Sequence, residues 1–257
     1  MEIIILSLAA FIVAILTFFS GFGLGTILTP VFMIFFPVEV AIALVAVVHF
    51  FNNIIIVSLV GKNADKTVLL RFGFPAILAS FAGAWLLLKI SNLSALYSYT
   101  IGSRLFEVTP VKFIIAILLI GFALLDLIPS LQRIQLNKNS LPIGGLLSGF
   151  FGGLSGHQGA LRSAFLIKAG LSKEAFIASA AALSVFIDIT RLSVYATRFS
   201  ETGLHEKMSY VLAATLAAIG GSLLAKKLLK KITLKFIQVT VAIMLFIIAI
   251  ALGAGFI

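Results

Sequence analysis

The chain has 257 residues, of which 61% are hydrophobic and 11% charged, with a formal net charge of +10 and a mean hydropathy of +1.20. A soluble fold of this length cannot bury so large an apolar fraction, so the composition excludes a soluble globular domain and predicts a protein embedded in lipid. The absence of cysteine excludes disulfides, thiolate metal sites and thiol catalysis. The Lys and Arg residues lie in short loops between apolar spans, which indicates membrane topology and not nucleic-acid binding.

The first apolar segment follows Met1-Glu2, which lacks the basic region of a signal peptide, so we expect this segment to remain in the mature protein. It ends in a glycine cluster, Ser20 to Gly25. Further apolar segments follow, each near or below the roughly 20 residues that cross hydrocarbon. In chain order the predicted helical segments are 2–19, 26–36, 38–60, 67–90, 110–128, 141–152, 159–169, 172–196, 208–229 and 233–256.

Two polar loops, Asn92 to Thr109 and Pro129 to Ser140, interrupt this series. The second loop divides the chain into a first transmembrane repeat, 1–128, an inter-repeat loop, 129–140, and a second transmembrane repeat, 141–257. The second half has its own glycine cluster, from Gly152 to Gly159. We therefore predict an all-α integral membrane protein of two pseudo-symmetric repeats, each beginning with a glycine-broken helix.

A shift of 135 residues supports the duplication, because it aligns the two glycine clusters and the segments that follow them without gaps. Paired glycine-interrupted segments in corresponding positions of two halves are typical of a transporter's central binding site. The eight identities are Gly21 with Gly156, Glu39 with Glu174, Ile42 with Ile177, Ala43 with Ala178, Ala46 with Ala181, Phe51 with Phe186, Ile54 with Ile189 and Ser58 with Ser193.

The broken segments leave two topologies open. If both cross the membrane, each half has four spans and the repeats are parallel; if both are re-entrant, each half has three spans and the repeats are inverted. With Arg162 and Arg191 set aside, the parallel arrangement divides the other 17 Lys and Arg residues 10 to 7 between the faces, and the inverted one 12 to 5. The stronger asymmetry favours inversion, with residues 226–235 cytoplasmic and the N-terminus outside.

Polar residues at membrane depth supply the candidate binding site, because such groups are costly in hydrocarbon and face a cavity or a partner. Glycines at a restarting helix expose backbone amides at its positive end, which forms a cradle for an anion. The candidate residues are Gly21, Gly23, Gly25, His49, Asn52, Asn53, Gly156, His157, Gln158, Arg162, Asp188 and Arg191.

Arg162 follows the second cluster by about one helical turn, so its guanidinium could fork onto a sulfonate or carboxylate; a structural bond to carbonyls or snorkelling is the alternative. Asp188 and Arg191 are three apart on one helix face, which fits an internal ion pair. Asp188 could instead hold Arg191 for substrate or exchange protons. His49 and His157 are expected either between helices as hydrogen-bonding residues or at the ligand.

The glycine motifs resemble those of the TauE/SafE family of membrane transporters, also called the sulfite exporter family. The resemblance is carried by Gly21-Phe22-Gly23-Leu24-Gly25, by Thr29-Pro30, by the alanine-rich span from Pro37, and by Gly145 to Gly156 in the second half. It implies a cell-membrane protein of about eight membrane segments that moves small, typically sulfur-containing anions. His157-Gln158-Gly159 departs from the family's usual Gly-Gly at this point, which leaves a substrate other than sulfite open.

The predicted function is secondary transport of a small anion by alternating access, with lipid as the surrounding partner and with proton or cation coupling left open. No cofactor, metal, catalytic residue or nucleic-acid partner is expected. A passive anion channel is the alternative, since a pore uses the same helix termini and basic groups. An intramembrane serine protease is a weaker one: Gly153-Leu154-Ser155-Gly156 matches a nucleophile motif, but the histidine downstream of His157 is His205, in a polar loop.

Overall fold

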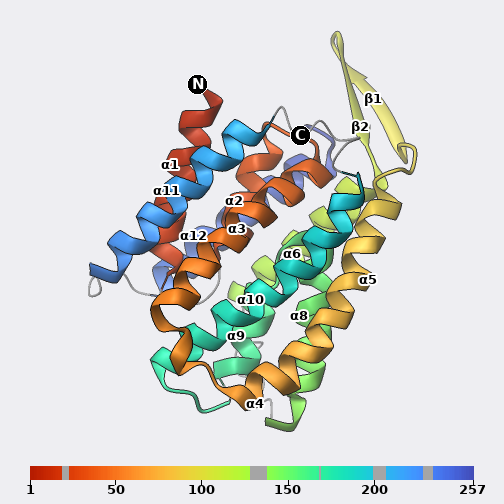
Figure 1. Ribbon diagram of the computed structural model, residues 1–257. Helices are drawn as coiled ribbons and strands as arrows, with labels where there is room; N and C mark the ends of the chain where they lie inside the picture. The colour runs from red at the N-terminus through yellow and green to blue at the C-terminus, as the bar shows by residue number, and fades with distance from the viewer. Residues whose placement is uncertain (19–22, 128–137, 168, 199–206, 228–233) are drawn as a thin grey trace.

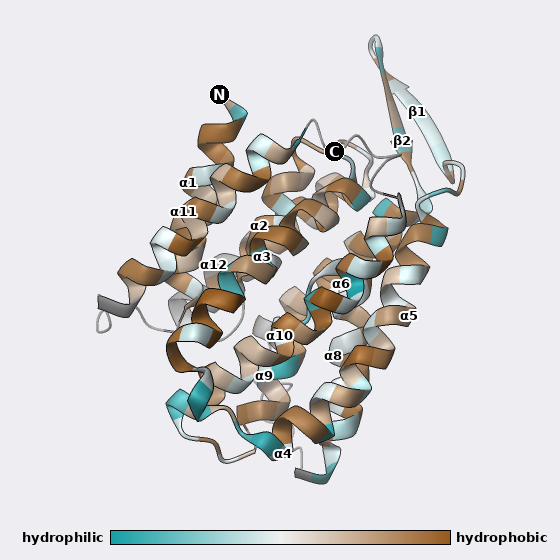
Figure 2. Cartoon of the chain, in the orientation of Figure 1, coloured by the Kyte–Doolittle hydropathy of each residue, from teal (hydrophilic) through white to brown (hydrophobic). Residues whose placement is uncertain are grey.

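The computed structural model describes residues 1–18, 23–127, 138–167, 169–198, 207–227 and 234–257. Gly21 and most of the inter-repeat loop lie outside the described residues. The chain forms an α-helical bundle in which both termini lie at the same end (Figure 1). Apolar residues cover most of the helices (Figure 2), and many large ones face outward, as expected for contact with lipid.

The helices follow the predicted apolar segments closely. In the first half they are α1 (Glu2–Thr17), α2 (Leu24–Met33), α3 (Val38–Val60), the 3-10 turn η1 (Gly61–Asn63), α4 (Lys66–Val68), the π-helical turn η2 (Leu69–Gly73), α5 (Phe74–Ile90) and α6 (Pro110–Leu127). In the second half they are η3 (Lys138–Ser140), α8 (Leu141–Ser155), α9 (Gly159–Ile167), α10 (Lys173–Tyr195), η4 (Ala196–Arg198), α11 (Met208–Lys227) and α12 (Leu234–Gly253).

Among the described residues, four helical segments are long and apolar enough to cross a membrane: Val38–Asn63, Lys66–Ile90, Lys173–Tyr195 and Met208–Ala225. The shorter apolar helices include α1 and α2, which form the first broken pair, and α8, which precedes the nine-residue α9 in the second. The described part of the chain is thus a helical membrane protein, as the composition predicts.

A β-hairpin is the one departure from the all-α expectation among the described residues. Strands β1 (Tyr97–Ile101) and β2 (Arg104–Val108) pair antiparallel within the segment that we predicted as a polar loop. The turn contains Gly102 at φ +63°, in the left-handed region that glycine adopts most easily. The hairpin projects from the end of the bundle that carries both termini (Figure 1), and the Tyr99 hydroxyl anchors it by donating to the Ala254 carbonyl.

Element bounds in the two halves coincide under the 135-residue shift. The shift carries α3 onto α10 and η1 onto η4 with identical ends, and it carries the start of α2 onto the start of α9. The packing pairs correspond as well: α1 packs on α11 while α8 packs on α5, and α3 packs on both α10 and α11 while α10 packs on both α3 and α5. Each half therefore places its first helix against the other half.

Equivalent helices run in opposite directions. In Figure 1, α1 and α3 start at the end that carries the termini, whereas α8 and α10 start at the other end. The contacts agree, because His49 bonds to Asp188 while Ile56 clusters with Ala181, so α3 and α10 are antiparallel. Since α1 and α3 run the same way, α2 returns the chain towards the end at which α1 began.

Glycines permit the closest helix contact. A Cβ atom on Gly145 would lie 2.2 Å from the Phe72 carbonyl oxygen, and one on Gly153 would lie 2.1 Å from that of Ser80. Phe72 precedes Ser80 in the sequence as Gly145 precedes Gly153, so the helix formed by η2 and α5 runs parallel to α8. Small residues of this kind let helix backbones approach in a membrane, where packing replaces the hydrophobic driving force.

Candidate functional site

The two glycine breaks meet at the centre of the bundle. Gly23, at φ +114°, caps the start of α2, and Gly156, at φ +77°, caps the end of α8. A Cβ atom on Gly25 would lie 3.1 Å from the Gly156 carbonyl oxygen and 3.6 Å from Cδ2 of His49. A Cβ atom on Gly156 would lie 2.8 Å from Nη1 of Arg191. Backbone thus meets backbone here, and polar side chains from α3 and α10 close around the contact.

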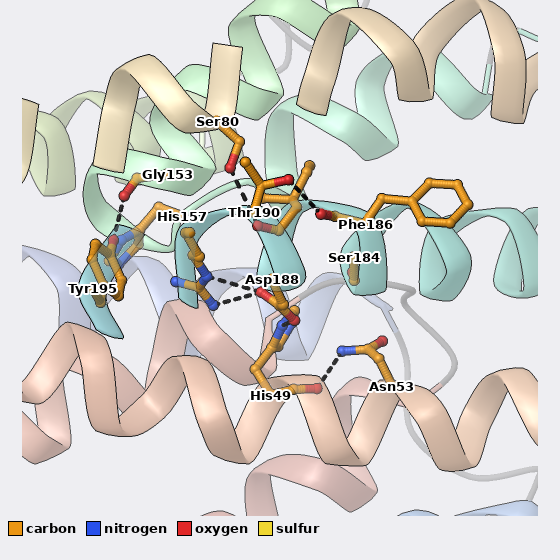
Figure 3. Close-up of polar contacts among 12 residues, drawn as sticks. His49, Asn53, Ser80, Gly153, His157, Ser184, Phe186, Asp188, Thr190 and Tyr195 are labelled. Atoms are coloured by element: carbon orange, nitrogen blue, oxygen red, sulfur yellow. Dashed lines mark hydrogen bonds and ion pairs between the residues drawn. The ribbon is translucent and has the colours of Figure 1, made fainter. Parts of the chain in front are cut away.

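A buried ionic network links α3 to α10 beside this contact (Figure 3). His49 Nδ1 lies 2.6 Å from Asp188 Oδ2, while Arg191 donates from Nε to Asp188 Oδ1 at 2.9 Å and places Nη2 2.7 Å from the same oxygen. All three side chains are buried. The predicted ion pair on α10 is therefore present, and it extends across the helix interface to His49, a contact that the sequence did not predict.

A small cavity of about 30 Å³ lies next to the network. Four predicted site residues line it: His49, Asn52 and Asn53 from α3, and Arg162 from α9. Its remaining lining is largely apolar and comes from α1, α2, α3 and α10: Thr17, Phe18, Leu24, Ile56, Ile177 and Ala181. This volume accommodates about one or two water molecules.

Arg162 is only 1% exposed, and its Nη1 donates to the Ser184 hydroxyl at 2.6 Å. The Ser184 hydroxyl orients the Arg162 guanidinium beside the cavity, and because it is neutral it does not offset the positive charge. Together Arg162 and Arg191 bring two guanidinium groups to the centre, and Asp188 brings one carboxylate. Among the described residues, the buried formal charges of this centre thus sum to a positive value, which favours an anion in the cavity.

Two asparagines present different groups to the cavity. Ser222 of α11 donates to Asn52 Oδ1 at 2.7 Å, which leaves the Asn52 amide nitrogen as the group available to a ligand. Asn53 donates from Nδ2 to the His49 carbonyl oxygen at 2.7 Å, so its own oxygen is the available atom. The cavity therefore combines donors, an acceptor and an apolar wall.

His157 and Gln158 are buried at the second break but do not line the cavity. The His157 ring stacks on Phe122, with ring centroids 5.7 Å apart, and its Nδ1 lies 2.8 Å from the Ser155 carbonyl oxygen. Ser148 donates to the Gln158 carbonyl oxygen at 3.0 Å. Within the described part of the chain, His157 Nε2 and the Gln158 side-chain amide make no hydrogen bond. These contacts fix the backbone conformation of the turn between α8 and α9.

The Ser155 hydroxyl does not form a nucleophile–base pair among the described residues. It donates to the Phe151 carbonyl oxygen at 3.0 Å, and the His157 ring contacts the serine's carbonyl and not its hydroxyl. A serine hydrolase needs the histidine nitrogen within hydrogen-bond reach of the hydroxyl. Tyr195 reinforces the same turn by donating from its hydroxyl to the Gly153 carbonyl.

The predicted residues thus divide into three groups by position. His49, Asn52, Asn53 and Arg162 line the cavity; Asp188 and Arg191 lie behind His49; and Gly23, Gly25, Gly156, His157 and Gln158 form the breaks. Ser184 and Ser222 were missed as orienting residues. Ser184 stands 135 positions after His49, so the repeat itself offered a signal. The described residues contain no cluster of three His, Asp or Glu side chains suited to a metal.

These helices, packed around a buried polar centre, define a multi-pass α-helical membrane protein. The chain matches the family model described as Sulfite exporter TauE/SafE over residues 6–252, and it belongs to that family. Comparison with curated proteins and with solved structures gave no match. Family membership makes the chain a transmembrane transporter.

Proposed function

We propose that the protein is a secondary transporter that binds a small anion, such as sulfite or an organosulfonate, in the cavity beside Arg162. The observation that carries this proposal is a guanidinium, 1% exposed, that lines a cavity of about 30 Å³ where two broken helices meet. A planar guanidinium matches the oxygens of a sulfonate or carboxylate. The Asn52 amide supplies a further donor, and the apolar wall accommodates a short carbon chain.

The architecture supports alternating access. We interpret the bundle as about eight membrane segments in the cell membrane. They form two inverted repeats, and each repeat contains a re-entrant broken pair of helices. Opposite directions of α3 and α10, and the packing of each first helix on the other half, support this interpretation. Rocking one repeat against the other would open the cavity to either face in turn, while Gly25 and Gly156 remain in contact.

Flux measurements in proteoliposomes test the proposal. Purified protein is expected to take up radiolabelled sulfite, sulfoacetate or a simple carboxylate, and Arg162→Ala should abolish this uptake while leaving membrane insertion intact. Arg71→Ala, which removes an exposed guanidinium, is the matched control and should transport normally. Equal uptake by the wild type and the Arg162 variant would show that the site is wrong.

Counterflow separates a carrier from a passive channel. In a carrier, unlabelled anion inside the vesicles drives transient accumulation of labelled anion, because each site must return across the membrane. A channel equilibrates the label without accumulation.

A further inference from the structure

We infer that His49 is the proton-binding residue of this transporter and that anion and proton bind the central cavity together. This inference rests on the proposed function and names its coupling ion. Among the predicted site residues, His49 alone both lines the cavity and contacts the buried carboxylate: one ring nitrogen bonds to Asp188, and the side chain lines the cavity that Arg162 also lines.

The contact with Asp188 fixes how the ring is used. A carboxylate beside Nδ1 holds the proton on that nitrogen and sets the orientation of the ring. In the neutral ring Nε2 then carries a lone pair, and it makes no hydrogen bond to any residue that the structure describes. The Nε2 edge lies against Gly25, 4.0 Å from where a Cβ atom would be. Nε2 is therefore the atom that gains the proton.

Charges around His49 make proton and anion binding mutually favourable. Asp188 stabilises the imidazolium directly, whereas Arg191 and Arg162 oppose an added positive charge until an anion enters. By linkage, an anion that favours the protonated ring must bind more tightly when the ring is protonated.

The other helices near α3 add few ionisable groups. α2 carries none, and the contact from α11 to this site is the Ser222 hydroxyl. The titratable residues elsewhere on these helices stand in end turns: Glu2 on α1, Lys112 and Asp126 on α6, and Tyr210, Lys226 and Lys227 on α11. Beyond Asp188 and Arg191, the titratable residues of α10 are Lys173 and Glu174 in its first turn and Tyr195 in its last turn.

The cycle conserves charge and protons. On the loading face, His49 Nε2 takes one proton from water as the anion enters beside Arg162, and the site's charge is unchanged when the anion carries one negative charge. On the opposite face, Nε2 releases that proton to water as the anion leaves. A monoanion is then carried electroneutrally with one proton, in the same direction.

A pair of assays on the same proteoliposomes tests this role. Net anion uptake driven by an inward proton gradient is measured with the membrane potential clamped, and trapped pyranine reports internal pH. Counterflow is measured at equal pH on both sides. We expect the wild type to acidify the lumen as the anion enters, and a protonophore to abolish the gradient-driven uptake but not the counterflow.

His49→Gln is the decisive variant, because glutamine keeps a hydrogen-bonding side chain that takes up no proton. It should lose gradient-driven net uptake and luminal acidification, and any anion counterflow that remains should be independent of pH. A monodisperse peak in size-exclusion chromatography shows that the variant is folded. Gradient-driven uptake equal to that of the wild type would overturn the inference.

Wild-type measurements provide a test that is independent of the variant. Anion accumulation with no change in luminal pH, and with no dependence on the proton gradient, would refute proton coupling while leaving the anion-transporter proposal intact. An absence of both net uptake and counterflow across the anion panel would refute the proposed function, and the coupling inference with it.

Discussion

Replacing Gly149 by alanine tests the closest helix contact in the bundle, the parallel pair α5 and α8. A Cβ atom at this position would lie 2.2 Å from the Ala76 carbonyl oxygen and 2.6 Å from its Cα, whereas ordinary contacts are 3.4–4 Å. The obstacle is backbone on a packed helix, so rotation of a side chain cannot relieve it. The two helices must separate by about 1 Å along the stripe that also contains Gly145 and Gly153.

Overpacking of this kind costs about 1–3 kcal/mol, and the higher helix propensity of alanine offsets up to about 1 kcal/mol. Gly121 in α6 supplies the matched control, because a Cβ atom there would meet nothing within 4 Å. Gly121→Ala should gain only the stabilisation that comes from the higher helix propensity of alanine. The difference between the two variants therefore isolates the clash, about 1–3 kcal/mol against Gly149→Ala.

Thermal or SDS-induced unfolding in detergent measures this difference. Gly149→Ala should unfold at a lower temperature or denaturant fraction than the wild type, while Gly121→Ala should match or exceed it. Equal stability of the two alanine variants would refute the close backbone packing on which the pairing of α5 with α8 depends.

Three further changes address the centre. Ser184→Ala removes a bond worth about 1.5–3 kcal/mol to the Arg162 guanidinium, and should raise the half-saturating anion concentration about tenfold or more; an unchanged value in initial-rate uptake would contradict the orienting role. Gly156→Val places a branched side chain at φ +77° and within 2.8 Å of Arg191, so it should abolish flux while surface labelling still detects inserted protein. Asp188→Ala leaves Arg191 buried without its carboxylate and should destabilise the protein by about 3–5 kcal/mol in SDS titration; wild-type stability would show that the pair is not structural.

Hydropathy predicted the helices well because lipid imposes one rule along the chain: apolar segments of sufficient length form helices. The segment predicted over 38–60 is α3, and the one predicted over 208–229 contains α11, which is described from Met208 to Lys227. The hairpin was missed because its residues were interpreted only by polarity. Its aromatic and β-branched runs on either side of Gly102-Ser103 carry a strand signal that polarity does not reveal.

The site residues were predicted by type, but their partners were not. The shift pairs Asn53 with Asp188, and the observed partner of Asp188 is His49, one turn earlier on α3. In the inverted repeats that we propose, the shift identifies symmetry counterparts, and two counterparts touch only where both lie near the symmetry axis. The counterpart of the His49–Asp188 pair is Asn53 with Ser184, so the two halves use the same positions with different chemistry.

The packing of α1 on α11 has a consequence for biogenesis. α1 is synthesised well before α11, which begins at Met208, so at about 5–20 residues per second α1 waits roughly 10–40 s for its partner. During that interval Gly221 and the rest of the α11 surface do not yet exist, and the α1 face that they later cover is open to lipid or to insertion factors. Neither half can complete its packing alone, so the membrane must hold an unfinished first half until α11 has been synthesised.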